Sequence, residues 1–124
     1  MVFILVADYE IFKRDSLLGV LDTDTGDIHQ MWGVPEIRGF INDHLEDIWI
    51  GFNSENYDKI LAHGMLTGKI STPEKAFEVS CAIIGAQDDD TPLYKVLPKL
   101  GIDDYYQCEI LMYDLLRRWS VLLT

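Results

Sequence analysis

The sequence is short of basic residues, of cysteine and of long apolar runs. It has 10 Lys and Arg against 21 Asp and Glu in 124 residues, a net charge of −11, and most of the excess acid lies in the first half. A field of this sign repels phosphate backbones, so tight electrostatic binding of nucleic acid is disfavoured unless divalent cations or a local basic patch reverse it. The composition therefore implies metal ions or basic protein partners.

The scarcity of cysteine excludes a disulfide framework. Cys81 and Cys108 have no metal-ligand spacing, and we expect both to be reduced thiols in the core of an intracellular protein. No apolar run approaches the roughly 20 residues of a membrane span. The apolar start, residues 1–7, lacks a basic region and is followed by Asp8 and Glu10, which is not typical of a signal peptide. These features predict a cytoplasmic protein that does not enter the membrane.

The chain has enough apolar residues to form one domain. Hydrophobic residues make up 48% and aromatic residues 11% of the sequence, and its length is within the usual range of one folded unit. We therefore expect a single domain over residues 1–124. The basic doublets are Lys13-Arg14 and Arg117-Arg118, for which a solvated surface is favoured over contact with phosphate.

Hydrophobic patterning predicts an α/β fold that begins β-β-β-α-β. Residues 2–8 are a short apolar run, typical of a strand that is buried on both faces in the middle of a sheet. Residues 16–21 and 28–32 predict two further strands joined by a tight turn. A helical stripe then runs from Pro35 to about Asp47.

The rest of the chain is predicted to add two strands and several helices. Residues 48–53 form a strand that follows a helix, so it is expected to lie parallel to an earlier strand. One helix is expected to be capped by Asn53 and Ser54, and another to start at Thr72. Residues 105–116 fit either a strand or a helix, and we favour a strand.

Two acids stand at the carboxyl end of the first predicted strand. Asp8 and Glu10 are two residues apart, so on a strand they share a face and lie about 6.6 Å apart along it. Like charges in a partly desolvated site repel each other unless a cation lies between them. Hard divalent ions such as Mg²⁺ and Mn²⁺ prefer oxygen ligands of this kind. The alternative interpretation is an ordinary solvated strand end.

A second polar cluster follows the strand at 48–53. Asn53 ends that strand, and Asp58 lies in the first turn of the following helix. If the two strands are neighbours, Asp58 approaches Asp8 and Glu10, and three carboxylates converge as in metal-assisted phosphoryl-transfer sites. Asp58 also fits a simpler role, because Asp commonly stabilises the N-terminus of a helix.

These residues resemble the motifs of a known family. Asp8-Tyr9-Glu10 is similar to the first motif of the 3′-5′ exonuclease domains of the DEDD superfamily, Asp-x-Glu after a strand. Residues 51–58, Gly-Phe-Asn-Ser-Glu-Asn-Tyr-Asp, are similar to the second motif, an Asn followed a few residues later by Tyr-Asp. The resemblance covers about residues 1–85, and it is closest to the proofreading domains of phage-type family B DNA polymerases.

The resemblance implies a ribonuclease H-like mixed sheet with flanking helices, and metal-dependent hydrolysis of single-stranded DNA ends. Asp8, Glu10 and Asp58 would be the catalytic residues and the ligands of Mg²⁺ or Mn²⁺. Asn53 and Tyr57 would line the cleft for the terminal nucleotide. The family context also implies DNA replication in the cytoplasm of a phage-infected or lysogenic bacterial host.

The third motif of the family is missing. That motif, Tyr-x-x-x-Asp or His-x-x-x-x-Asp on a late helix, supplies a fourth carboxylate. Tyr105 and Glu109 have the spacing with the wrong acid, and Asp114 has no Tyr four or His five residues before it. The chain stops at Thr124, so we expect a fold that is truncated at its C-terminus. Because removing one electrostatic stabiliser costs roughly 10²–10³ in rate, activity is expected to be weak or absent.

An inactive, acidic binding protein is the alternative function. Its negative charge would engage the basic surface of a nucleic-acid-binding partner, and the motifs would be relics. Apolar surface left by missing C-terminal elements would favour a homodimer. The histidines are expected at the surface or in packing roles, and the tryptophans in the core: His29, His44, His63, Trp32, Trp49 and Trp119.

Overall fold

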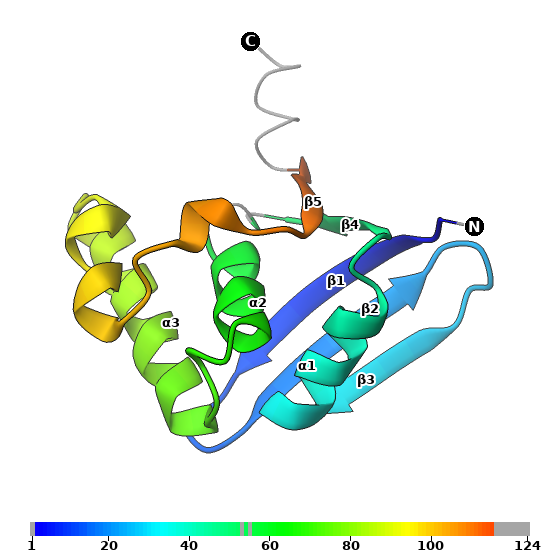
Figure 1. Ribbon diagram of the computed structural model, residues 1–124, viewed down its shortest axis with the longest axis horizontal. Coiled ribbons are helices and arrows are strands. Elements are labelled where there is room, and N and C mark those ends of the chain that lie inside the picture. Colours follow the sequence, from blue (N-terminus) through cyan, green and yellow to red (C-terminus); the bar gives the residue numbers. More distant parts are fainter. Residues whose placement is uncertain (1, 53, 55, 116–124) are drawn as a thin grey trace, which may run out of the picture.

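The computed structural model describes residues 2–52, 54 and 56–115. The protein is an α/β protein whose five strands form one mixed sheet in the order β3-β2-β1-β4-β5 (Figure 1). The strands are β1 (Ile4–Ile11), β2 (Ser16–Asp22), β3 (Ile28–Trp32), β4 (Ile48–Gly51) and β5 (Leu111–Asp114).

The first strand lies at the centre of the sheet, as its sequence predicts. β1, β2 and β3 are joined as antiparallel hairpins, whereas β4 runs parallel to β1 and β5 runs parallel to β4. Val6 lies opposite Ile50, and Gly51 lies opposite Asp114. The carboxyl ends of β1, β4 and β5 therefore point to the same end of the sheet.

The helices cover one face of the sheet (Figure 1). They are α1 (Val34–Asp43), α2 (Asp58–Leu66) and α3 (Pro73–Asp88), followed by the short 3₁₀ helices η1 (Leu93–Lys95), η2 (Leu97–Leu100) and η3 (Tyr105–Gln107). The core lies between this layer and the sheet, where burial of apolar surface stabilises the fold. Its fully buried side chains include Leu5, Leu18, Trp49, Ile60, Leu61, Met65 and Ile83.

The outer face of the sheet is open over the part of the chain that the structure describes. Along β1, Ala7 and Tyr9 point towards the helices, whereas Ile4 and Val6 are 38% and 37% exposed. The prediction that the first strand is buried on both faces is therefore wrong, because no described helix lies over this side. Trp32 is 47% exposed at the end of β3, so its predicted place in the core is also wrong.

β3 forms one edge of the sheet. The turn before it uses Gly26 in the left-handed conformation, with φ of 78°, as the predicted tight turn requires. Ile28, the first residue of β3, is 74% exposed. Among the described residues, one side of this short strand thus has no neighbouring strand.

The first helix is shorter than predicted. α1 ends at Asp43 rather than near Asp47. The Asp47 carboxylate accepts a hydrogen bond of 3.0 Å from the backbone amide of Phe3, and its other oxygen lies 2.6 Å from His44 Nδ1. These contacts tie Asp47 to the start of the chain and hold it outside the helix.

The predicted N-terminal cap is present in α3 and absent from α2. α3 begins after Thr72, whose hydroxyl accepts a hydrogen bond of 3.1 Å from the amide of Lys75, as predicted. α2 begins at Asp58, so Ser54 is too far from it to be its cap. Asn53 lies outside the described residues.

The remaining predictions have mixed outcomes. Residues 105–116 contain both the turn η3 and the strand β5, so the favoured strand is present but short. Cys81 is exposed, which contradicts its predicted place in the core, whereas Cys108 is partly buried. Trp49 is a core residue, while Trp119 and the second basic doublet lie outside the described residues. None of the described helices has the length and apolar character needed to cross a membrane.

Candidate functional site

Asp58 lies at the point where β1, β4 and α2 meet. It is the first residue of α2 and is only 4% exposed. β4 ends at Gly51, and its pairing with β1 stops at Val6. The Asp58 carboxylate instead accepts a hydrogen bond from the backbone amide of Tyr9. The acid thus occupies the edge of β1 just beyond the end of its parallel neighbour.

The surroundings of Asp58 favour its neutral form. Burial first, and then the negative charges of Asp8 and Asp114, raise the pKa of this carboxyl to about 7. Hydrogen bonds from the amides of Tyr9 and of Asp58 itself oppose the rise. A buried acid with two acidic neighbours is costly to ionise without a cation, which is the property expected of a metal-binding carboxylate.

The structure brings together two of the three predicted ligands. Asp8 interacts electrostatically with Asp58, as expected if the two strands are neighbours. Glu10 shares the outer face of β1 with Asp8, and both line a shallow groove of about 270 Å³ along that face. Within residues 2–52, 54 and 56–115, no group of three or more His, Cys, Asp and Glu side chains is positioned to hold a metal ion.

The two predicted nucleotide-binding residues are placed differently. Asn53 is not among the described residues. Tyr57 precedes α2, and its hydroxyl lies 2.6 Å from Ser80 Oγ on α3. Burial and the charge of Asp58 raise the pKa of the Tyr57 phenol. In this structure Tyr57 therefore ties α2 to α3 through its hydroxyl.

Sequence reasoning did not assign Asp114 to this site. It ends β5 opposite Gly51, it is 7% exposed, and its charge acts on Asp58. The third motif of the family lies on a helix, whereas Asp114 ends a strand, so a search for that motif's spacing does not find Asp114. The only available signal was its position after an apolar strand, the same context that singles out Asp8.

A close contact between Gly51 and Ser54 shapes the loop before Asp58. A Cβ atom on Gly51 would lie 2.5 Å from Ser54 Cβ, so only glycine fits. The Ser54 side chain is fully buried, and its hydroxyl has no hydrogen-bond partner within the described part of the chain. Its carbonyl accepts hydrogen bonds from the amides of Tyr57 and Lys59. The loop is thereby folded tightly over the end of β4, which brings Asp58 back to β1.

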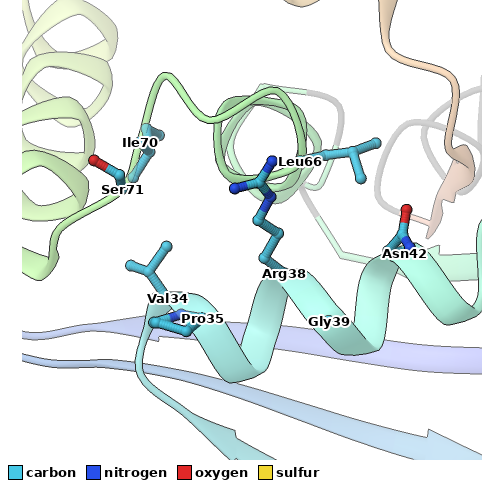
Figure 2. Close-up of a pocket in the computed structure, with 8 residues that line it drawn as sticks. All are labelled: Val34, Pro35, Arg38, Gly39, Asn42, Leu66, Ile70 and Ser71. Carbon is cyan, nitrogen blue, oxygen red and sulfur yellow. The ribbon is translucent and has the colours of Figure 1, made fainter.

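A second groove lies on the helical side and is separate from the acids. It has a volume of about 610 Å³ and lies between α1 and the segment that joins α2 to α3. Figure 2 shows Arg38 projecting from α1 into this groove between Leu66 and Ile70. Leu66 ends α2, whereas Asp58 begins it, so the groove and the acids lie at opposite ends of this helix.

The chain was also compared with known proteins. No protein-family model, curated protein or solved structure shows significant similarity to it.

Proposed function

We propose that this protein is a 3′-5′ exonuclease-like domain that hydrolyses phosphodiesters at single-stranded DNA ends with divalent metal ions. One observation carries the proposal: the buried Asp58, the first residue of α2, lies within electrostatic reach of Asp8 on β1, where the parallel pairing of β1 with β4 has ended. A protein that used these acids only at its surface would have no reason to bury one of them beside another.

The order of the strands supports a ribonuclease H-like topology. Three antiparallel strands are followed by two strands parallel to the first, in the order β3-β2-β1-β4-β5. Acids at the ends of the central strand and of its parallel neighbours are what such a nuclease needs. This arrangement goes beyond the α/β class and is part of the proposal.

The donor atoms suit Mg²⁺ or Mn²⁺. Asp8 and Asp58 would hold a cation, with Glu10 completing the set from the outer face of β1, because hard cations favour carboxylate oxygens. When bound, such ions supply a nucleophilic water at neutral pH and stabilise the leaving oxygen. Carboxylates repel each other without a cation, so an arrangement looser than a coordination shell is expected in the metal-free chain.

The chain's own residues fix these acids in place. The amide of Tyr9 orients the Asp58 carboxylate. The Tyr9 ring is buried beneath the site, and its hydroxyl donates to Met65 Sδ at 3.5 Å. Asp58 is only 4% exposed beside this packing, while Asp8 is accessible on the outer face.

Asp114 is our candidate for the fourth acid. It comes from a parallel strand that ends at the same edge of the sheet, and its charge acts on Asp58. It would take the part of the acid that the family's third motif supplies, but from a strand rather than a late helix. Because this acid would come from a strand in place of a helix, we expect lower activity than that of a complete exonuclease.

The test is a nuclease assay on a 5′-labelled oligodeoxynucleotide with Mn²⁺ or Mg²⁺. Shortening from the 3′ end should require the metal and should fall at least 10²-fold in Asp8→Ala. Asp24→Ala is the matched control, because Asp24 lies in an exposed turn away from the site. Equal residual activity in wild type and Asp8→Ala would reject the proposal. Salt-sensitive binding to a basic protein, unchanged by Asp8→Ala, would then favour the acidic binding protein.

A further inference from the structure

Two exposed aromatic rings stand beside the acids at the edge of the sheet. Phe12 directly follows β1, and Trp32 ends β3. Their ring centroids are 6.2 Å apart and their planes differ by 15°, so the rings are stacked. Phe12 is 45% exposed and Trp32 47% exposed. Large aromatic side chains usually bury most of their surface, so a stacked pair half open to solvent offers ring surface to a ligand.

The register of the sheet places this pair in line with Glu10. Glu10 lies opposite Leu17, and Leu17 lies opposite Trp32, so the three residues form a row across the outer face. Neighbouring strands are about 4.8 Å apart, which puts Trp32 about 10 Å from Glu10 along the row. At the stacked spacing of about 3.4 Å per nucleotide, that distance corresponds to about three nucleotides.

The turn that carries Phe12 also carries the basic doublet of the described chain. The amide of Phe12 donates to the carbonyl of Asp15 at 2.9 Å and closes a turn that contains Lys13 and Arg14. Both basic side chains are exposed, and no ion pair in the described part of the chain involves them. In a protein with a net charge of −11, these residues place two exposed positive charges next to Phe12, in a turn that also contains Asp15.

The outer-face groove contains the acids and reaches Leu17, the residue opposite Trp32, although neither ring lines it. It is lined by Asp8, Glu10 and Leu17, and it passes over Gly19, which lies opposite Asp8. A Cβ atom on Gly19 would come no closer than 3.8 Å to Asp8, so a side chain would fit there and would fill the groove. Glycine at this position keeps the groove open next to the acids.

We propose that Phe12 and Trp32 form a base-stacking platform for single-stranded DNA, with Lys13 and Arg14 contacting its phosphates. This inference rests on the proposed function and adds the subsite that holds the strand upstream of the cleaved end. Aromatic rings beside basic residues are the means by which proteins bind single strands without reading sequence. The charges of Lys13 and Arg14 also reduce, at this turn, the negative field that repels phosphates.

The test measures binding of a fluorescent ten-nucleotide oligo(dT) in Mg²⁺, with Asp8→Ala as the background so that no cleavage occurs. Adding Phe12→Ala or Trp32→Ala should raise the dissociation constant about tenfold or more. Phe12→Tyr and Trp32→Phe keep an aromatic ring and should bind nearly as well, which separates stacking from loss of folding. Tyr94→Ala removes an even more exposed ring, on η1, and should have no effect.

The salt dependence tests the phosphate contacts separately. Lys13→Ala and Arg14→Ala should each lower the slope of log affinity against log salt by about one. In the active protein, Trp32→Ala should raise the KM for the ten-nucleotide substrate and leave the hydrolysis of a dinucleotide unchanged, because a dinucleotide is too short to reach the platform.

The outcomes separate this inference from the proposed function. Unchanged oligonucleotide binding in Phe12→Ala and Trp32→Ala, with metal-dependent cleavage intact, would overturn the platform alone. Weakened binding without any metal-dependent cleavage would support the platform and reject the exonuclease. If the two ring variants instead turn a dimer into a monomer in sedimentation and bind DNA normally, the rings are a contact between copies and the platform is wrong.

Discussion

The carboxylate of Asp58 accepts the backbone hydrogen bond of Tyr9. A side chain from the start of α2 thereby satisfies an amide of the central strand beyond the point where β4 stops. The same bond that pairs the Tyr9 amide also holds a buried acid beside Asp8.

Replacing this acid should make the protein more stable at neutral pH. The pKa of Asp58 is about 7 in the folded chain and about 3.9 in an unfolded chain. The folded state then binds more protons, so the free energy of unfolding falls as pH rises from about 4 to about 7. Asp58→Asn keeps an acceptor for Tyr9 and should remove this fall, gaining about 2–4 kcal/mol at pH 8 and little at pH 4.

Urea unfolding at both pH values checks this expectation, with Asp24→Asn as the exposed control. Nuclease activity should be lost in the same Asp58→Asn variant. A variant that is less stable than wild type at pH 8 would show that the ionised carboxylate is stabilised by its surroundings.

Divalent cations should stabilise the wild-type protein and lose this effect when a ligand is removed. An ion that binds only the folded chain at 100 times its dissociation constant adds about 2.7 kcal/mol. We expect Mn²⁺ to raise the melting temperature of wild type, to raise it less in Asp114→Asn, and to leave Asp8→Ala nearly unchanged. An equal rise in Asp8→Ala would place the ion elsewhere.

The close packing of Gly51 predicts a specific structural cost. Gly51→Ala would put a Cβ atom 2.5 Å from Ser54 Cβ, which forces the loop before Asp58 to move. We expect a loss of about 1–3 kcal/mol in unfolding free energy, together with a loss of metal affinity. Adding Ser54→Gly should restore part of both. Gly85→Ala is the matched control, since nothing lies within 4 Å of its Cβ position in α3.

Tyr57 allows a test of its role. Tyr57→Phe removes the hydroxyl that lies 2.6 Å from the buried Ser80 Oγ. If the hydroxyl only joins α2 to α3, the variant should lose about 1 kcal/mol of stability and keep its kcat for oligonucleotide cleavage. A large fall in kcat with unchanged stability would indicate that the Tyr57 phenol contacts the substrate, as the sequence predicts.

Much of the fold could be predicted because its local signals agree. The apolar runs of β1 and β4, the glycine turn before β3 and the Thr72 cap of α3 each specify their element through short-range chemistry. The parallel pairing of β1 and β4 follows from the helix between them, and it brings Asp58 within reach of Asp8 as expected.

The errors arise where distant contacts decide. The burial of β1 on its outer face depends on whether another element covers it, which the apolarity of the strand does not reveal. The place of Asp114 depends on the pairing of β5 with β4 across some sixty residues of chain. The exposed Trp32 shows the same limit, because an aromatic residue looks alike in a core strand and at an open edge.

The excess of acidic residues protects the open edge of β3 from pairing with other molecules. A short edge strand that begins with the exposed Ile28 is a template on which the strand of another molecule can grow. Mutual repulsion between chains that each carry a charge of −11 keeps such templates from meeting. Concentrated salt, or acidification towards the isoelectric point, removes that protection and should bring the molecules together as aggregates.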